Sequence, residues 1–135
     1  MARTKAPATA AQAFFWAQVL GIEVEDHSDF VDKLVADGHM SADDRIVING
    51  RSEFRTVASC GDPAGVEPRF FFQQVPESKV AKNRMHLDIL VEPDQKLAEV
   101  ARLEKLGARL IDTNSDFRPL TYVMCDPEGN EFCLH

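Results

Sequence analysis

The sequence predicts an α+β fold in which one strand–helix–strand–hairpin plan is used twice, giving two βαβββ modules of which the first lacks its opening strand. Three observations support this prediction. The plan is complete after residue 84, an Asp-Pro-x-Gly turn occurs in both halves, and a glycine ends a helix before a strand in both halves. We predict a single domain made of module one (8–75), a linker (76–83) and module two (84–135).

The second half serves as the template for this plan. A strand is predicted at 85–91, followed by a helix from Pro93 to Leu106 that carries an apolar residue at every third position and ends at Gly107. A strand at 109–111 and a loop at 112–119 come next. Two strands, 120–125 and 130–135, then close on the turn Asp126-Pro127-Glu128-Gly129 as a hairpin.

The first half follows the same plan with a shorter start. A helix at 10–20 ends at Gly21, and strands are predicted at 22–25, 54–59 and 69–75, with the turn Asp62-Pro63-Ala64-Gly65 before the last of them. Three consecutive phenylalanines predict that 69–75 is a central strand rather than an exposed one.

The first half also contains an insertion. Gly21 and Asp62 are 41 residues apart, whereas Gly107 and Asp126 are 19 apart, so the first half is 22 residues longer over this interval. The extra residues fall in 28–50. A short helix (29–37) and a strand (45–49) are predicted there, and Asn49-Gly50 is typical of a hairpin turn in which both residues have positive φ.

The counterpart of the template's first strand is not found. His86 lies 21 residues before Gly107, and the same distance before Gly21 leads to position 0. The edge is left open, or residues 1–7 fill it, or a second subunit covers it. Because an open strand edge favours unwanted pairing, and because the helix at 10–20 is apolar nearly all round, we expect a homodimer.

Composition limits the partners and the compartment. A chain of 135 residues with 44% hydrophobic residues can bury a core of its own. Fifteen Lys and Arg against 22 Asp and Glu give a net charge of −7, which argues against nucleic acid or an anionic membrane as a partner. Three cysteines, no signal peptide and no apolar run of membrane-spanning length predict a cytoplasmic protein.

Two segments carry a family resemblance: VPESKVAKNRMHLD before the template strand and VMCDPEGNEFCL at the last hairpin. With the doubled βαβββ plan, they resemble the glyoxalase/bleomycin resistance/dioxygenase (vicinal oxygen chelate) superfamily, and its glyoxalase-like domains in particular. The resemblance implies that the two modules form an open mixed β-barrel or sheet around a central pocket that receives a small molecule.

The resemblance also implies where a metal ion would bind. Metal-using members place a histidine on the first strand and a glutamate on the last strand of each module. These positions fall on His86 and Cys133 in module two and near Gln73 in module one, and the fourth has no counterpart. We therefore predict no cofactor. The alternative is a divalent metal, with His86 and Cys133 joined by Glu131 or His135 to hold zinc.

Strand alternation predicts which side chains face the pocket. On the template strand, Leu87, Ile89 and Val91 face the helix. The last strand directs Phe132 and Leu134 to the same side. A four-residue turn would pair Cys125 with Asn130 and Cys133 with Tyr122, which places the two thiols on opposite faces. The predicted pocket side chains are His86, Asp88, Leu90, Tyr122, Met124, Glu131, Cys133 and His135.

His86 and Glu131 are the candidate catalytic residues. Beside apolar Tyr122 and Met124, Glu131 could have a raised pKa suited to a general base, or it could be an exposed carboxylate at the rim. The alternative for His86 is a strand histidine hydrogen-bonded near Asp88. A nearby basic group could bind an anion or simply be solvated, and it consists of Lys79, Lys82 and Arg84.

Two functions follow. The first is a small-molecule-binding protein that needs no metal, with a net acidity that favours cationic ligands. The second is a metal-dependent lyase, isomerase or dioxygenase of the glyoxalase type, with His86, Glu131 and Cys133 at the site. A broken set of inherited metal ligands favours the first.

Overall fold

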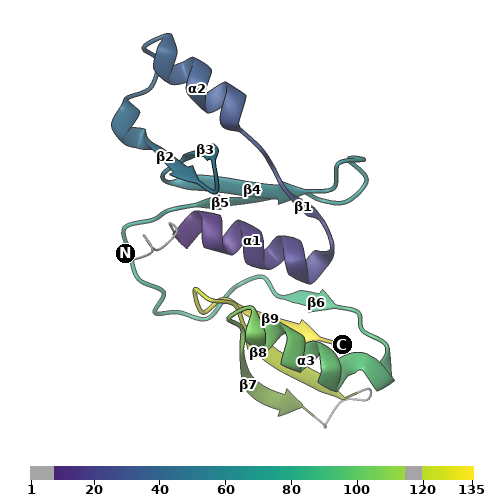
Figure 1. The fold of residues 1–135 in the computed structure, drawn as a ribbon. Coiled ribbons are helices and arrows are strands. Elements are labelled where there is room, and N and C mark those ends of the chain that lie inside the picture. Colours follow the sequence, from purple (N-terminus) through teal and green to yellow (C-terminus); the bar gives the residue numbers. More distant parts are fainter. Residues whose placement is uncertain (1–7, 115–119) are drawn as a thin grey trace. The chain divides into compact units, whose positions relative to one another are not determined.

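The computed structural model describes residues 8–114 and 120–135, and the chain forms two compact units, 1–76 and 77–135. Both units combine helices with β-sheets, which confirms the α+β class (Figure 1). No helix in the described ranges is long and apolar enough to cross a membrane. The suggestion that residues 1–7 fill a sheet edge concerns a segment outside the described residues.

The second unit has the complete βαβββ order. Its elements are β6 (Leu87–Ile89), the short 3-10 helix η2 (Pro93–Gln95), α3 (Lys96–Lys105), β7 (Arg109–Asn114), β8 (Thr121–Cys125) and β9 (Glu131–Leu134). The strands form one sheet in the order β6-β9-β8-β7, in which β6 runs parallel to β9 and the other pairs are antiparallel. The strand predicted at 109–111 continues to Asn114, so it includes the start of the predicted loop. The remainder of that loop, 115–119, lies outside the described residues.

The first unit repeats the last part of this plan. It contains α1 (Ala8–Leu20), β1 (Glu23–Val24), β4 (Val57–Gly61) and β5 (Phe70–Gln73), with the three strands in the antiparallel order β1-β4-β5. The helix packs against all three strands, and the ring of Trp16 stacks on that of Phe70 with centroids 6.3 Å apart. Among the described residues, no strand takes the place beside β5 that β6 has beside β9.

The insertion forms a helix and a separate hairpin between β1 and β4. It consists of α2 (Ser28–Ala36), the 3-10 helix η1 (Ala42–Asp44), β2 (Arg45–Ile48) and β3 (Arg51–Phe54). Asn49 and Gly50 have φ of 51° and 79°, as the predicted turn requires. The strand predicted at 54–59 is in fact two strands, because β3 pairs with β2 up to Phe54 whereas β4 begins at Val57 in the other sheet.

The prediction that the phenylalanine strand is central was wrong. In the part of the chain that the structure describes, β5 is an edge strand, and Phe71 is 56% exposed. The physical reason is the alternation of side chains along a strand, which lets only two of three consecutive residues face the helix. Phe70 and Phe72 are the two that lie on the side of Cys60 and Ala58, which are buried.

The turn at Asp126 sets the register of the last hairpin, and here the sequence-based pairing was wrong by one residue. Asp126 accepts hydrogen bonds through Oδ1 from the backbone N–H groups of Glu128 and Asn130, both at 2.9 Å. These bonds close a five-residue loop, so Cys125 pairs with Glu131 and Val123 pairs with Cys133. Tyr122 and Met124 therefore lie with Leu134 and Phe132 on the opposite face from Cys133, and the two thiols share one face.

Replacing Asp126 by alanine should lower the free energy of unfolding by about 1–3 kcal/mol, because Asp126 is only 3% exposed and its loss leaves the partly buried N–H groups of Glu128 and Asn130 without their acceptor. Asp62 is the matched control. It accepts from the N–H groups of Ala64, Val66 and Glu67 in the equivalent turn but is more exposed, so water can replace it and Asp62→Ala should lower the free energy of unfolding clearly less. Urea unfolding measures both, and equal losses would contradict this account.

Candidate functional site

The second sheet brings three of the predicted pocket residues together on the face opposite its buried aromatic and aliphatic residues. Asp88 and Cys133 are direct partners in the parallel pair β6–β9. His86 precedes β6, with Nδ1 3.5 Å from the Cys133 Sγ and 3.6 Å from the Asp88 Oδ1. Donor atoms of the three side chains all lie within 4.8 Å of one another. This juxtaposition agrees with the predicted alternation of β6.

The three residues differ in their access to solvent. Cys133 is buried, whereas the side chains of His86 and Asp88 are 37% and 64% exposed. Burial raises the pKa of the Cys133 thiol, the charge of Asp88 adds to this effect, and Lys82 opposes it. At neutral pH Cys133 is therefore a thiol rather than a free nucleophilic thiolate.

Glu131 does not have the environment that the sequence predicted. Its carboxylate accepts hydrogen bonds from its own backbone N–H and from that of Asn83, the latter at 3.1 Å, and it lies 3.4 Å from the Lys79 Nζ. These contacts lower the pKa of Glu131, so of the two alternatives that the sequence left open the raised pKa was wrong. The same contacts fasten the segment before β6 to β9, and Lys79 makes an ion pair instead of presenting a free charge.

The other predicted residues are spread over both units. Tyr122 and Met124 are buried on the opposite face of the second sheet, and so they do not accompany Cys133. His135 follows β9, where its Nδ1 lies 3.4 Å from the Thr121 hydroxyl, and Leu90 is 81% exposed. Gln73 belongs to the first unit, where it ends β5 opposite Val57 and is exposed.

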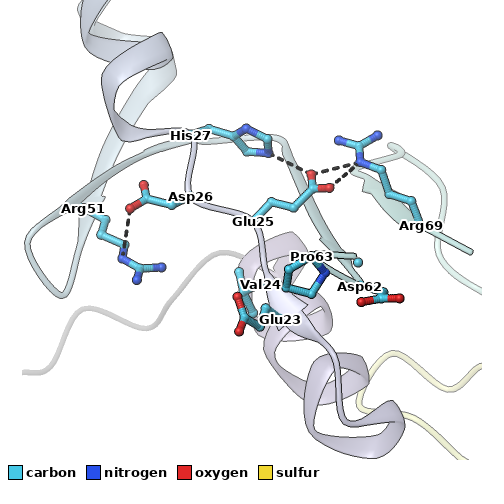
Figure 2. A pocket seen from close by; sticks show the side chains of 10 residues that line it. Glu23, Val24, Glu25, Asp26, His27, Arg51, Asp62, Pro63 and Arg69 are labelled. Carbon is cyan, nitrogen blue, oxygen red and sulfur yellow. Dashed lines mark hydrogen bonds and ion pairs between the residues drawn. The ribbon is translucent and has the colours of Figure 1, made fainter. Parts of the chain in front are cut away.

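A groove of about 620 Å³ lies in the first unit, and sequence reasoning did not find it. Figure 2 shows its side chains, most of which come from β1, the segment after it and the start and end of the loop between β4 and β5. The residues that line it are Glu23, Val24, Glu25, Asp26, His27, Arg51, Gly61, Asp62, Pro63 and Arg69. The one available signal was the alternation in Ile22–Glu25, which places Glu23 and Glu25 on one side of a strand.

Glu25 is the centre of the polar network at this groove. Arg69 donates through Nε to both carboxylate oxygens of Glu25, at 2.7 and 2.9 Å, and the Ser59 hydroxyl donates a short hydrogen bond to the same carboxylate. The hydrogen bond from Arg69 is the largest cause of a low pKa of about 2 for Glu25. A network of this kind needs residues 44 positions apart, so local sequence patterns cannot reveal it.

Ser59 and His27 resemble part of a nucleophile–base pair, since the Ser59 Oγ lies 3.0 Å from the His27 Nε2. The surroundings argue against that role. Ser59 is 1% exposed, it already donates its proton to Glu25, and it accepts a hydrogen bond from the Arg69 Nη2 at 3.1 Å. The same His27 nitrogen also lies 3.4 Å from the Glu25 carboxylate, so this acid contacts the side of the ring that faces Ser59 instead of orienting the ring from its far side. We interpret Ser59 and His27, with Glu25 and Arg69, as a hydrogen-bond network that stabilises the fold.

The groove has an acidic balance. It contains four carboxylates, Glu23, Glu25, Asp26 and Asp62, against two guanidinium groups, Arg51 and Arg69, which leaves a formal charge of −2 with His27 neutral. Arg51 pairs with Asp26 at 3.5 Å (Figure 2), and the Asp62 carboxylate accepts N–H groups of its turn. Within the described residues, no ion pair involves Glu23, so its charge faces the groove uncompensated.

Comparison with protein families finds one match: a model described as a glyoxalase-like domain covers residues 2–135. A comparison with curated proteins finds no match. Among solved structures, a glyoxalase/bleomycin resistance protein/dioxygenase family enzyme from Burkholderia phytofirmans is similar with a TM-score of 0.58 and 16% identity, over 95% of this chain and 89% of that one.

Two further solved structures show the same likeness of fold. A glyoxalase/dioxygenase from Nostoc punctiforme has a TM-score of 0.54 and 16% identity, over 93% of this chain and 81% of that one. A protein described as oxidase ChaP-H2 has a TM-score of 0.51 and 15% identity, over 99% of this chain and 93% of that one. At these identities the likeness establishes the fold.

Replacing Glu25 by glutamine should lower the free energy of unfolding at pH 7 by about 1–2 kcal/mol. This value allows for solvent screening of the ion pair, because the Arg69 side chain is half-exposed. The folded pKa of about 2 lies below the usual 4.5, so the ionised carboxylate stabilises the fold above about pH 4.5. That contribution is lost as the pH falls through the folded value. Denaturant unfolding between pH 7 and pH 2 should show the difference from wild type disappear.

Glu23→Gln is the control for this experiment, since Glu23 lies on the same strand and makes no ion pair with a described residue. It should change the free energy of unfolding by less than about 0.5 kcal/mol. A Glu25→Gln effect that stayed constant down to pH 2 would show that the carboxylate charge is not its cause.

Proposed function

We propose that this chain, which belongs to the glyoxalase-like domain family, is a small-molecule-binding protein whose first unit holds the ligand in the groove beside β1. The observation that supports this most directly is the groove itself. Its volume of about 620 Å³ falls within the range of typical small-molecule sites, and its lining combines charged groups with Val24 and Pro63.

The charges of the groove favour a ligand with a positive charge. A cationic molecule would meet the formal charge of −2 and could pair with Glu23, the carboxylate that no described residue compensates. Beside the groove, the Arg69 guanidinium lies 5.8 Å from the centre of the exposed Phe71 ring. That ring offers an apolar or aromatic contact surface for the rest of a ligand.

Binding in this groove needs no metal ion. Three of its four carboxylates already have partners: Glu25 pairs with Arg69, Asp26 pairs with Arg51, and Asp62 accepts backbone N–H groups. A hard cation requires several free oxygen ligands, and Glu23 alone does not supply them. The ligand itself is therefore the cation that this groove suits.

The second candidate function is that of a metal-dependent enzyme of the glyoxalase type, which the cluster of His86, Asp88 and Cys133 favours. These three residues would hold the ion. A bound ion would act as a Lewis acid that polarises a substrate oxygen. Glu131 is engaged by Lys79 and Asn83, so in this candidate it positions the strand and does not take the proton.

A homodimer is the assembly that we propose. In the described residues, β5 is an edge strand with unpaired backbone groups, and Phe14 on α1 is 55% exposed. A second copy could pair with this edge and cover Phe14, as edge strands are commonly covered. Light scattering at micromolar concentration should give the mass of a dimer, and a monomer would refute the assembly.

The proposed function is tested with a panel of small primary and quaternary amines, together with uncharged and carboxylate analogues of the same size. Amines should raise the thermal midpoint, whereas their analogues should not, because only the cations complement the groove. Addition of EDTA should leave the shift unchanged. Isothermal titration of the best amine should show roughly five-fold weaker binding for Glu23→Gln, as expected when about 1 kcal/mol of charge interaction is lost.

Glu104→Gln provides the matched control, since Glu104 is an exposed carboxylate on α3 in the other unit and its replacement changes the net charge equally. Its affinity for the amine should equal that of wild type. Equal weakening in the two variants would indicate a general charge effect, and a shift abolished by EDTA would contradict metal-free binding.

A further inference from the structure

We infer that the ligand of the groove beside β1 is a zwitterion, a small molecule that carries both an ammonium group and a carboxylate. Glu23 binds the ammonium group, and Arg51 binds the carboxylate. This inference rests on the proposed function, since it keeps a cationic group in the groove, and it names the chemical class of the ligand. It follows from two charged side chains whose binding capacity is not used up within the folded chain.

The sheet gives the ammonium group its place beside Glu23. Glu23 on β1 is the direct partner of Gly61 on β4, so no side chain occupies the neighbouring position on the face of the sheet that Glu23 shares. A Cβ atom at position 61 would lie 3.4 Å from the Glu25 Oε1 and 3.6 Å from the Arg69 Cγ. Gly61 thus lets this ion pair lie close against β4, and the groove stays open next to Glu23. No ion pair with a described residue neutralises the Glu23 carboxylate.

Arg51 has donor groups left over for an anion. It is the first residue of β3, and its side chain is 52% exposed. Its Nε is 3.5 Å from the Asp26 Oδ2, which is the one ion pair that it makes with a described residue (Figure 2). Neither terminal nitrogen of its guanidinium donates a hydrogen bond within the part of the chain that the structure describes. Those two nitrogens form the planar fork that binds a carboxylate through two parallel hydrogen bonds.

Arg69, the other arginine of the groove, does not have this capacity. Its Nε donates to both oxygens of Glu25, and its Nη2 donates to the Ser59 hydroxyl at 3.1 Å. With its fork already engaged, Arg69 contributes positive charge to the groove but no second bidentate site. Arg51 is therefore the group that can bind a carboxylate of the ligand.

The acidic balance of the groove opposes a simple anion but not a zwitterion. A carboxylate alone would bring a negative charge into a groove that has more carboxylates than guanidinium groups. In a zwitterion the ammonium group offsets that charge and holds the carboxylate near Arg51, so the second contact forms within one bound molecule. A volume of about 620 Å³ holds both charged groups and the carbon chain that joins them.

The competing interpretation is that Arg51 only balances Asp26 and that the groove accepts any small amine. The two interpretations predict opposite effects of adding a carboxylate to an amine ligand. If Arg51 is only a counter-ion, the added negative charge meets an acidic groove and weakens binding. If Arg51 binds the carboxylate, the same addition strengthens binding.

Pairs of ligands that differ only in this charge provide the test. β-Alanine, γ-aminobutyrate and δ-aminovalerate are each compared with their primary amides, which keep the ammonium group and the chain length but lose the negative charge. Isothermal titration of the intact protein at pH 7 measures both members of each pair. At least one acid should bind about ten-fold more tightly than its amide. The chain length that binds best reports the spacing between the two charged groups of the site.

Three variants assign the groups. Arg51→Gln should bring the ratio of acid to amide affinity to about one or below, and this ratio cancels any change in ammonium binding that the unpaired Asp26 causes. Glu23→Gln should weaken the acid and its amide equally, by roughly five-fold. Arg84→Gln is the matched control, because Arg84 is an exposed arginine of the second unit and its loss changes the net charge equally. It should keep the wild-type ratio, and circular dichroism checks that each variant is folded.

If the amide binds at least as tightly as its acid in all three wild-type pairs, the inference is wrong and amine binding in the groove still stands. A ratio that persists in Arg51→Gln, or that is lost equally in Arg84→Gln, would also overturn it. If neither acids nor amides bind, the proposed function fails and the inference fails with it. The wild-type comparison needs no variant, so it decides the matter even where Arg51→Gln does not fold.

Discussion

The carboxylate of Asp126 determines which side chains of the second unit share a face. Because it accepts hydrogen bonds from the N–H groups of Glu128 and Asn130, the hairpin closes with a five-residue loop. The length of this loop sets every residue pair between β8 and β9. A loop shorter by one residue would exchange the two faces of β8 relative to Cys133. The juxtaposition of Cys133 with Asp88 and His86 also depends on β9 keeping its position beside β6.

The two units use their helix-free sheet faces differently. In the first, the polar groups around Glu25 are already engaged with one another and are not available for catalysis. Arg69, Ser59 and His27 each contact the Glu25 carboxylate or another member of this network. In the second, the donors of the cluster lack such compensation, because His86 and Asp88 are exposed and Cys133 has only the imidazole as a partner among the residues that the structure describes. The first unit thus has a groove with a net negative charge, and the second has a cluster of side-chain donor atoms.

The sequence predicted the features that depend on short-range patterns. Helix ends at Gly21 and Gly107, the positive-φ turn at Asn49-Gly50 and the alternation of β6 rest on neighbouring residues, and the structure agrees with each of them. The exposure of Phe71 and the hairpin register were missed. The first depends on which strands flank β5, and the second on side-chain hydrogen bonds inside a turn, which the Asp-Pro-x-Gly motif does not specify.

The candidate site was predicted in part for the same reason. His86, Asp88 and Cys133 were assigned to one face from alternation and family resemblance, but Tyr122 and Met124 were added through the incorrect register. The groove around Glu25 was not predicted at all. Its charged pairs, such as Glu25 with Arg69, join positions far apart in the sequence that only the folded chain brings within hydrogen-bond distance.

The insertion between β1 and β4 begins and ends at nearly the same place. The backbone N–H of Glu25 donates to the Ser59 carbonyl at 3.0 Å, so the two chain ends of the inserted helix and hairpin meet across one hydrogen bond. Because its two ends are held together, the length of the inserted segment affects the free energy of folding only through the loop-closure entropy, which grows slowly with length. We therefore expect that a longer or shorter inserted segment at this position would cost little free energy of folding, next to the groove and without altering the pairing of β1 with β4.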